Sequence, residues 1–176
     1  APMNWKYTPE LFGFPFCGAL SRVNRLIDLF GRVKAVSCET QQTKSAVDSG
    51  FYTNILCSGR LRFENGMVAE MTYGKGDRIW MSQRAIEVHG SQGSLAFVGN
   101  QGRLTTDVGS KPIAAPPRKG LLAEDTARVL AYLSEGTALY VSAAESIYAL
   151  RVGDALKRAS EQQTTVLVDD LVLVDD

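Results

Sequence analysis

The stretch from Phe51 to Asp107 constrains the fold more than any other part of the chain, because short apolar runs alternate there with tight turns. The breaks fall at Glu64-Asn65-Gly66, Gly74-Lys75-Gly76, Ser91-Gln92-Gly93 and Gly99-Asn100-Gln101-Gly102. Asn-Gly between two alternating runs is a strong hairpin signal, since both residues tolerate the positive φ of a type I′ turn. Consecutive hairpins predict a meander and therefore a mainly antiparallel sheet.

Helical spacing flanks this meander on both sides. Apolar residues recur at helical intervals from Leu20 to Phe30, ahead of Gly31, which suits a left-handed helix cap. Further on, one helix is predicted from Leu121 to Ser134, and another begins at Ser142 with Glu145 completing a capping box. An antiparallel sheet with its helices segregated on one face is an α+β fold, with the sheet left open.

Three further segments complete this outline. The Pro- and Gly-rich residues from Val108 to Gly120 predict a surface crossover, and Thr164 to Val168 predict a closing strand. The stretch from Gly13 to Gly18 predicts a place where the backbone comes close to another element.

Length and composition exclude several classes of protein. A chain of 176 residues fits one domain, spanning residues 1–176. Lys plus Arg equal Asp plus Glu at 19 each, without a basic block, so neither DNA nor RNA is an expected partner. Three cysteines favour free thiols and a cytoplasmic location. No apolar run approaches the roughly 20 residues of a membrane helix, so no membrane partner is expected.

The residues alone offer no self-sufficient active site. A glycine-rich turn that follows a strand and opens a helix, as dinucleotide binding requires, is absent from the sequence. The single histidine, His89, precedes a glycine at a strand end, which favours a structural or solvent-facing role, and no metal site is expected. Aromatic and cationic residues near the start are candidates for a polar-ligand pocket, against the alternative of ordinary packing or solvation: Trp5, Lys6, Tyr7, Arg22 and Arg25.

The order of these segments resembles the carboxy-terminal domain of the Gfo/Idh/MocA family of NAD(P)-dependent oxidoreductases. Trp5 to Leu11, a glycine-containing bend and the helix ending in LFGRV are similar to the family's W-R-x-x-P-E segment and L-x-G-x-V helix end. The stretches FENGMVAEMTY, IEVHGSQGSLAF and ALKRAS are similar to its meander, turn and last helix. The resemblance implies an open antiparallel sheet whose second face serves oligomer contacts. It also implies a preceding dinucleotide-binding domain, absent here, so NAD or NADP is expected in the full-length parent only.

The sequence departs from this family where the family's D-x-x-x-H, often followed by x-x-D, is thought to act in proton transfer. Counting back from Gly31, these positions hold Cys17, Ser21 and Asn24. A serine hydroxyl is no general base near pH 7 without a partner that accepts its proton. A register slipped by four residues places Arg25 and Asp28 there, and arginine is always charged. The catalytic residues are therefore unknown.

The leading hypothesis is the substrate-binding and oligomerisation domain of an NAD(P)-dependent oxidoreductase acting on a sugar, a cyclitol or a related polyol. Such a domain is not catalytic alone, and it binds its small polar substrate next to the dinucleotide-binding domain of the parent chain. The alternative is a non-enzymatic binding or assembly module that has lost the catalytic Asp and His. The predicted pocket is formed by Trp5, Lys6, Ser21, Asn24 and Arg25.

The meander also predicts self-association, because its apolar residues are expected to form a contiguous apolar sheet face, and such a face is usually covered by a partner. A two-fold homodimer through facing sheets is the expected arrangement. The residues assigned to that face are Ile55, Cys57, Leu61, Phe63, Met67, Ala69, Met71 and Tyr73.

Overall fold

A computed structural model describes residues 16–44, 52–76, 83–115 and 120–168. The predicted pocket residues Trp5 and Lys6 lie outside these ranges. The chain divides into two compact units, residues 1–79 with 141–176 and residues 80–140. Each unit is described by itself.

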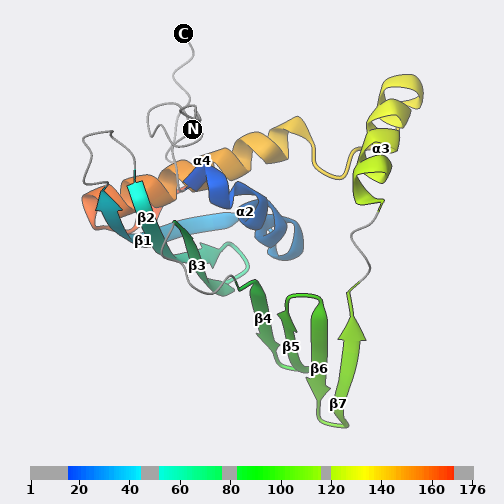
Figure 1. Cartoon of the computed structure of the whole chain (residues 1–176), viewed down its shortest axis with the longest axis horizontal. Coiled ribbons are helices and arrows are strands. Elements are labelled where there is room, and N and C mark those ends of the chain that lie inside the picture. The colour runs from blue at the N-terminus through cyan, green and yellow to red at the C-terminus, as the bar shows by residue number, and fades with distance from the viewer. Residues whose placement is uncertain (1–15, 45–51, 77–82, 116–119, 169–176) are drawn as a thin grey trace. The chain divides into compact units, whose positions relative to one another are not determined.

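The first unit is an antiparallel sheet, sheet A, with two helices on one face (Figure 1). The strand order is β3-β2-β1-β8, and every neighbouring pair is antiparallel. The elements are α2 (Phe16–Phe30), β1 (Val33–Lys44), β2 (Tyr52–Phe63), β3 (Val68–Gly76), α4 (Ala143–Gln162) and β8 (Val166–Leu167).

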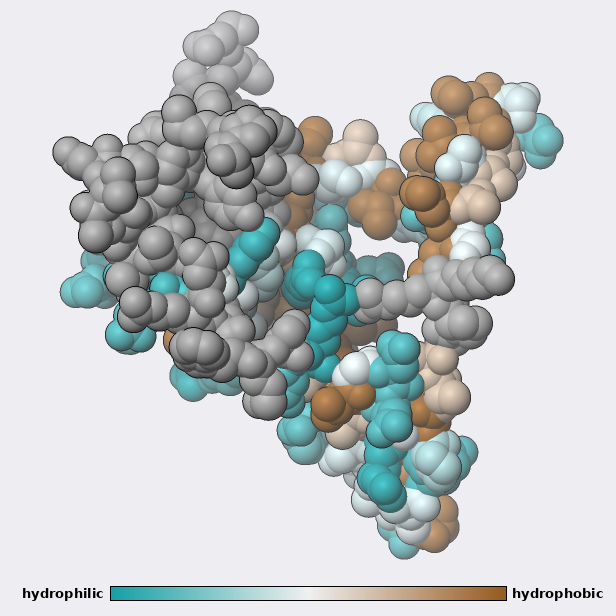
Figure 2. All heavy atoms as spheres, viewed as in Figure 1, coloured by the Kyte–Doolittle hydropathy of each residue, from teal (hydrophilic) through white to brown (hydrophobic). Residues whose placement is uncertain are grey.

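The second unit holds a four-stranded antiparallel meander, sheet B, in the order β4-β5-β6-β7, followed by helix α3. Helix α3 has no buried residue, and Figure 2 shows apolar side chains gathered over it. The elements are β4 (Ala85–Gly90), β5 (Gly93–Val98), β6 (Gln101–Thr106), β7 (Gly109–Ala114) and α3 (Leu121–Glu135).

These elements confirm the predicted α+β class and its antiparallel pairing, but the strands form two sheets instead of one. The division follows β3. The predicted break at Gly74-Lys75-Gly76 is wrong, because these residues are the last three of β3 and pair with β2; β3 ends at Gly76, whose φ is 155°. The predicted crossover between Val108 and Gly120 is wrong in part, since β7 lies there. Its Pro112 is tolerated because β7 is an edge strand, where one row of backbone N–H groups has no ladder partner to lose.

The Asn-Gly hairpin is present, but its turn is not the predicted type I′. Only Gly66 has a positive φ, of 87°, and its N–H donates to the Phe63 carbonyl at 3.1 Å. Asn65 keeps a negative φ and uses its side chain instead: Nδ2 donates to the Phe30 carbonyl at 3.0 Å, and Oδ1 accepts from Met67 N–H at 3.0 Å. The turn is therefore tied to the end of α2, a contact that no local pattern predicts.

Both predicted helix ends are confirmed. Gly31 adopts a φ of 87° and donates to the Ile27 carbonyl at 2.8 Å. Ser142 Oγ accepts from Glu145 N–H, while the Glu145 carboxylate accepts from Ser142 N–H, which completes the capping box of α4. The backbone hydrogen bond from Ser142, followed by the one from its hydroxyl, lowers the pKa of Glu145.

The core lies between sheet A and its two helices, and it contains most of the residues that were assigned to a free sheet face. Ile55, Cys57, Leu61, Phe63 and Met71 are all buried. The inference that these residues form an apolar outer face is wrong, because all of them share the register of the helix-covered side. The outer face of sheet A instead presents Arg60, Arg62 and Glu70 among smaller residues.

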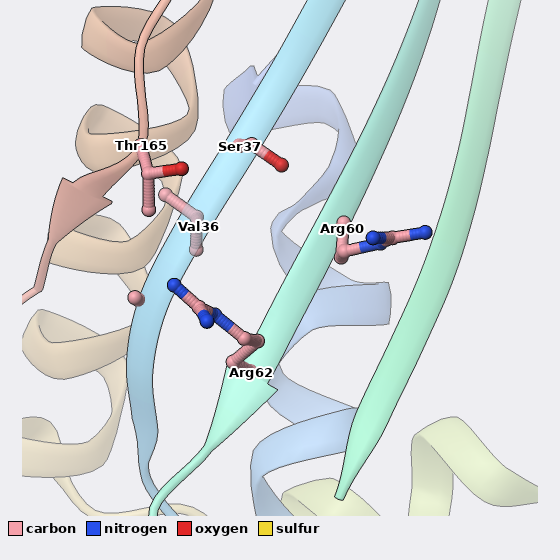
Figure 3. Close-up of a pocket in the computed structure, with 6 residues that line it drawn as sticks. Val36, Ser37, Arg60, Arg62 and Thr165 are labelled. Atoms are coloured by element: carbon pink, nitrogen blue, oxygen red, sulfur yellow. The ribbon is translucent and has the colours of Figure 1, made fainter.

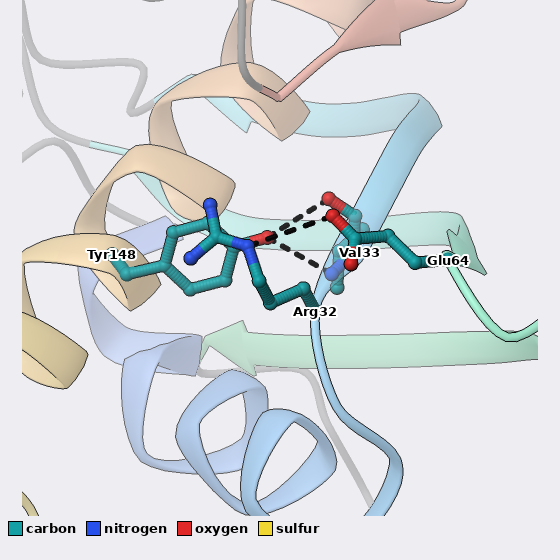
Figure 4. Close-up of polar contacts among 4 residues, drawn as sticks. All are labelled: Arg32, Val33, Glu64 and Tyr148. Atoms are coloured by element: carbon teal, nitrogen blue, oxygen red, sulfur yellow. Dashed lines mark hydrogen bonds and ion pairs between the residues drawn. The ribbon is translucent and has the colours of Figure 1, made fainter.

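Tyr148 on α4 forms hydrogen bonds with the backbone of the first residue of β1 (Figure 4). Its hydroxyl accepts from Val33 N–H and donates to the Val33 carbonyl, each at 2.9 Å. The Arg32 guanidinium lies 4.1 Å from the centre of the Tyr148 ring, and Arg32 Nε is 3.5 Å from Glu64 Oε1. One phenol thus satisfies two backbone groups that the sheet leaves without a strand partner.

The structure describes the side chains of two of the three cysteines, and both are free, as predicted. Cys38 and Cys57 lie in the core with their sulfur atoms 3.2 Å apart. The hydrogen bond with Cys38, followed by burial, raises the pKa of Cys57, so this thiol is neutral near pH 7. Over the described ranges, the helices include none with the length and apolarity to cross a membrane.

Candidate functional site

Helix α2 presents the residues that the sequence assigns to the site. Its buried stripe, with Ala19 at 2% and Val23 at 0% exposure, fixes the rotation of the helix against the core. Ser21 and Arg25 are exposed, and Asn24 is half-buried at the edge of the buried stripe. These three residues therefore lie together within two helical turns. Cys17 lies in the first turn of α2, and its side chain is outside the described part of the chain.

The hydrogen-bond partner of Ser21 cannot activate its hydroxyl as a general base. The Arg22 guanidinium donates to Ser21 Oγ, with Nη1 at 2.7 Å. Activation of a hydroxyl requires a neighbour that accepts its proton, and a guanidinium has no capacity to accept one. The exposed side of α2 therefore offers the guanidinium groups of Arg22 and Arg25, which suit the binding of an anionic or carbonyl oxygen. Asp28, which is also exposed, lies about one turn beyond Arg25 and adds one negative charge.

Tyr73 on the edge strand β3 reaches the first turns of α2 and was missed as a site residue. A Cβ added to Gly18 would lie 2.8 Å from Tyr73 Oη, so glycine at this position leaves room for the phenol. The Arg22 guanidinium lies 5.8 Å from the centre of the Tyr73 ring, within the range of a cation–π contact. The close approach predicted for Gly13 to Gly18 is thus confirmed at Gly18, whereas Gly13 lies outside the described residues.

This contact gives a first prediction. In the wild-type background, Gly18→Ala is expected to be neutral or destabilising, because its gain in helix propensity opposes the overlap with Tyr73 Oη. In the Tyr73→Phe background the nearest remaining atoms are 3.4 and 3.5 Å away, so the same change is expected to stabilise by up to about 1 kcal/mol. A double-mutant cycle from urea unfolding measures the difference. Equal effects in both backgrounds contradict the contact.

The remaining polar groups within the described ranges form no further candidate site. His89 is exposed, as predicted; Nδ1 lies 2.9 Å from Ser94 Oγ and Nε2 lies 3.7 Å from Glu87 Oε2. With the histidine and glutamate side chains 73% and 63% exposed, water competes for each of these bonds. No group of three or more metal-ligating side chains is found in the part of the chain that is described.

Comparison with known proteins settles the family. Residues 1–168 match the model of the oxidoreductase family, C-terminal alpha/beta domain. The chain therefore belongs to the Gfo/Idh/MocA family of oxidoreductases and corresponds to its C-terminal domain, as the motifs indicated. A comparison with curated protein sequences gives no match.

Among solved structures, the chain is similar to biliverdin reductase from Synechocystis sp. PCC 6803 in complex with biliverdin and NADP+. The two share 38% sequence identity and superpose with a TM-score of 0.83, and the match covers 92% of this chain and 51% of that one. An oxidoreductase from Agrobacterium radiobacter in complex with NAD+, L-tartaric acid and magnesium matches with 14% identity, a TM-score of 0.74 and coverage of 88% and 48%. Levoglucosan dehydrogenase in complex with NADH matches with 16% identity, a TM-score of 0.73 and coverage of 96% and 54%.

The chain thus spans about half the length of the structures it matches. The two matches below 25% identity establish the fold alone. The first match differs from them because more than a third of its aligned residues are identical to those of this chain.

Proposed function

We propose that this chain is the substrate-binding domain of an NAD(P)-dependent reductase whose substrate is an open-chain tetrapyrrole of the biliverdin type. The domain works when joined to a dinucleotide-binding domain and is not catalytic alone. The observation that carries the proposal is the 38% identity to biliverdin reductase over 92% of the chain. The matches to the oxidoreductase from Agrobacterium radiobacter and to levoglucosan dehydrogenase, at 14% to 18% identity, carry no information about substrate.

The two arginines of α2 support an anionic substrate. Biliverdin is a tetrapyrrole with two carboxylate side chains, whereas sugars and cyclitols are neutral. Arg25 is exposed on α2, and the neighbouring Arg22 is held by Ser21 and Tyr73. Guanidinium groups bind carboxylates with paired, charge-assisted hydrogen bonds. Arg25, Asn24 and Ser21, together with Trp5 and Lys6, are the proposed contacts of the substrate.

The missing histidine also fits this reaction. Oxidation of an alcohol releases a proton from the hydroxyl, so an enzyme gains from a base beside it. Reduction of a conjugated tetrapyrrole consumes a proton instead, and the nicotinamide supplies the hydride. Ser21 and Asn24 in place of a base are therefore compatible with a reductase. The same substitutions are expected in a non-enzymatic module, which is the competing account.

The test uses the full-length parent enzyme that contains this domain. We expect it to oxidise NADPH or NADH in the presence of biliverdin, and to leave NAD(P)+ unchanged with a panel of sugars and cyclitols. Arg25→Ala is expected to raise the KM for biliverdin by about tenfold or more through loss of a charge-assisted contact, with a smaller effect on kcat. Arg158→Ala, on α4, is the control and should change neither constant.

Each other outcome rejects a part of the proposal. Turnover of a sugar or cyclitol without biliverdin reduction restores the polyol substrate predicted from sequence. Cofactor binding without turnover of either class favours the binding or assembly module. Biliverdin reduction that is unaffected by Arg25→Ala removes α2 as the substrate contact.

A cytoplasmic location and a homodimer through the outer face of sheet A remain parts of the proposal. The two free thiols support a reducing compartment. The dimer no longer rests on an apolar face, since the outer face bears Arg60, Arg62 and Glu70. What supports it now is that the described helices of this unit pack on the opposite side of the sheet.

A further inference from the structure

The outer face of sheet A carries two adjacent rows of side chains, each crossing the strands of the sheet. Because directly paired residues point to the same face, the register defines both rows. In the first, Arg60 lies between Glu70 on β3 and Ser37 on β1. The second, the Arg62 row, contains Val68, Arg62, Ala35 and Leu167.

The two arginines have different neighbours on the adjacent strands. Arg60 lies opposite Glu70, and its guanidinium contacts the Glu70 carboxylate, with Nη2 and Nε each 2.6 Å from Oε1. Arg62 lies between the apolar residues Val68 and Ala35, and within the described residues no carboxylate pairs with it. On the outer face, Arg60 is therefore ion-paired and Arg62 is in contact with no described carboxylate. Glu39, the other acidic residue of β1 on this face, lies opposite Ser58, two rows away from Arg62.

Arg62 also borders a depression of about 220 Å³ on this face. Figure 3 shows Arg62 extending toward β1, while Arg60 points toward β3. The residues that line it include Ala35, which is only 2% exposed although it lies on the outer face, and the hydroxyl-bearing Ser37 and Thr165 (Figure 3). All of the polar side chains that line the depression can donate hydrogen bonds.

Apolar surface flanks this cluster of donors. In the Arg62 row, Val68 is 50% and Leu167 is 46% exposed, which leaves apolar side chains on both sides of the guanidinium. A ligand that matches the row has a single negative charge for Arg62 and an apolar body for the exposed side chains of Val68 and Leu167. A flat body gains further, because a guanidinium stacks on planar groups.

We propose that this depression is a binding site for a carboxylate with a small apolar or planar body. Arg62 pairs with the carboxylate, Ser37 and Thr165 donate to its oxygens, and the Arg62 row covers the body of the ligand. The site is separate from the candidate site on α2, because α2 and α4 pack on the opposite face of sheet A. It is therefore independent of the proposed reductase activity. It competes with the proposed homodimer, because both use the outer face of sheet A.

The probe is benzoate, titrated into the 176-residue chain while backbone amide signals are followed by NMR. We expect saturable shifts at Ala35, Arg62 and Leu167. Arg62→Gln is expected to weaken binding by about tenfold or more, since it removes the charge without breaking a described contact. Arg103→Gln, an exposed arginine on a strand of sheet B, is the matched control and should bind benzoate as the wild type does.

Two more ligands separate the charge from the apolar body. Inorganic phosphate and benzyl alcohol, each of which lacks one of the two features, are both expected to bind more weakly than benzoate. Phosphate binding as tightly as benzoate overturns the role of the Arg62 row, and benzoate binding unchanged by Arg62→Gln overturns the site. If benzoate fails to bind and light scattering shows a dimer, a second copy covers this face and the ligand proposal is rejected.

Discussion

Replacement of Tyr148 by phenylalanine is expected to lower the free energy of unfolding by about 2 to 4 kcal/mol, although it removes a single oxygen atom. That oxygen accepts from Val33 N–H and donates to the Val33 carbonyl, and Val33 is fully buried. Phenylalanine leaves both backbone groups in the core without a partner, and each buried unsatisfied group costs about 1 to 3 kcal/mol. Urea unfolding of the 176-residue chain, followed by circular dichroism, measures the loss.

The ring of Tyr148 remains in this variant, so its packing and its contact with Arg32 are retained. Tyr132→Phe is the matched control, because the Tyr132 side chain is 48% exposed. Its expected change is within about 0.5 kcal/mol. If the two variants lose the same stability, the hydroxyl of Tyr148 has no special role at the start of β1.

Local patterns were sufficient to predict most of the elements of this fold. The helical spacing before Gly31, the capping box at Ser142 and the alternation along β2 and β3 each act over a few residues, so the sequence shows them directly. The order of these elements also led to the family. What local spacing does not contain is the side of the sheet on which the helices pack.

Because that information is missing, core residues of sheet A were wrongly assigned to a free outer face. Alternation showed that Cys57, Leu61 and Met71 share one face, but both a helix-covered core and a dimer interface produce the same pattern. The helices α2 and α4 occupy that face, and the charged residues of β2 lie on the other. β7 was missed for a related reason, since Pro112 argues against a strand unless its place at the sheet edge is known.

The residues of the candidate site could be predicted from the sequence, but their contacts with residues distant in the sequence could not. Ser21, Asn24 and Arg25 could be placed on one helix from spacing alone. Tyr73, which is far away along the chain, lies against Gly18 and under the guanidinium of Arg22, the residue that donates to Ser21. Likewise, Arg62 lacks a carboxylate partner because the strand register places Val68 and Ala35 beside it, and local spacing does not determine the register between strands.

Leu156→Ala is expected to destabilise the chain by about 2 to 5 kcal/mol, the range for a large buried side chain whose removal leaves a cavity. Leu156 is fully buried on α4. Its Cδ2 would lie 3.0 Å from a Cβ added to Gly59 on β2, so this leucine fills the space above a glycine of the sheet. Leu150→Ala on the same helix is the control: that side chain is 46% exposed, and its loss should cost less than about 1 kcal/mol.

The pair also predicts a compensating change. Gly59→Ala alone is expected to destabilise, because the added methyl group meets Leu156 in a packed core. In the Leu156→Ala background, the same methyl group enters the cavity and is expected to be neutral or stabilising. A double-mutant cycle from urea unfolding measures this coupling. Additive losses would mean that α4 does not pack on β2 at this point, which would also undo the placement of the helices on the inner face of sheet A.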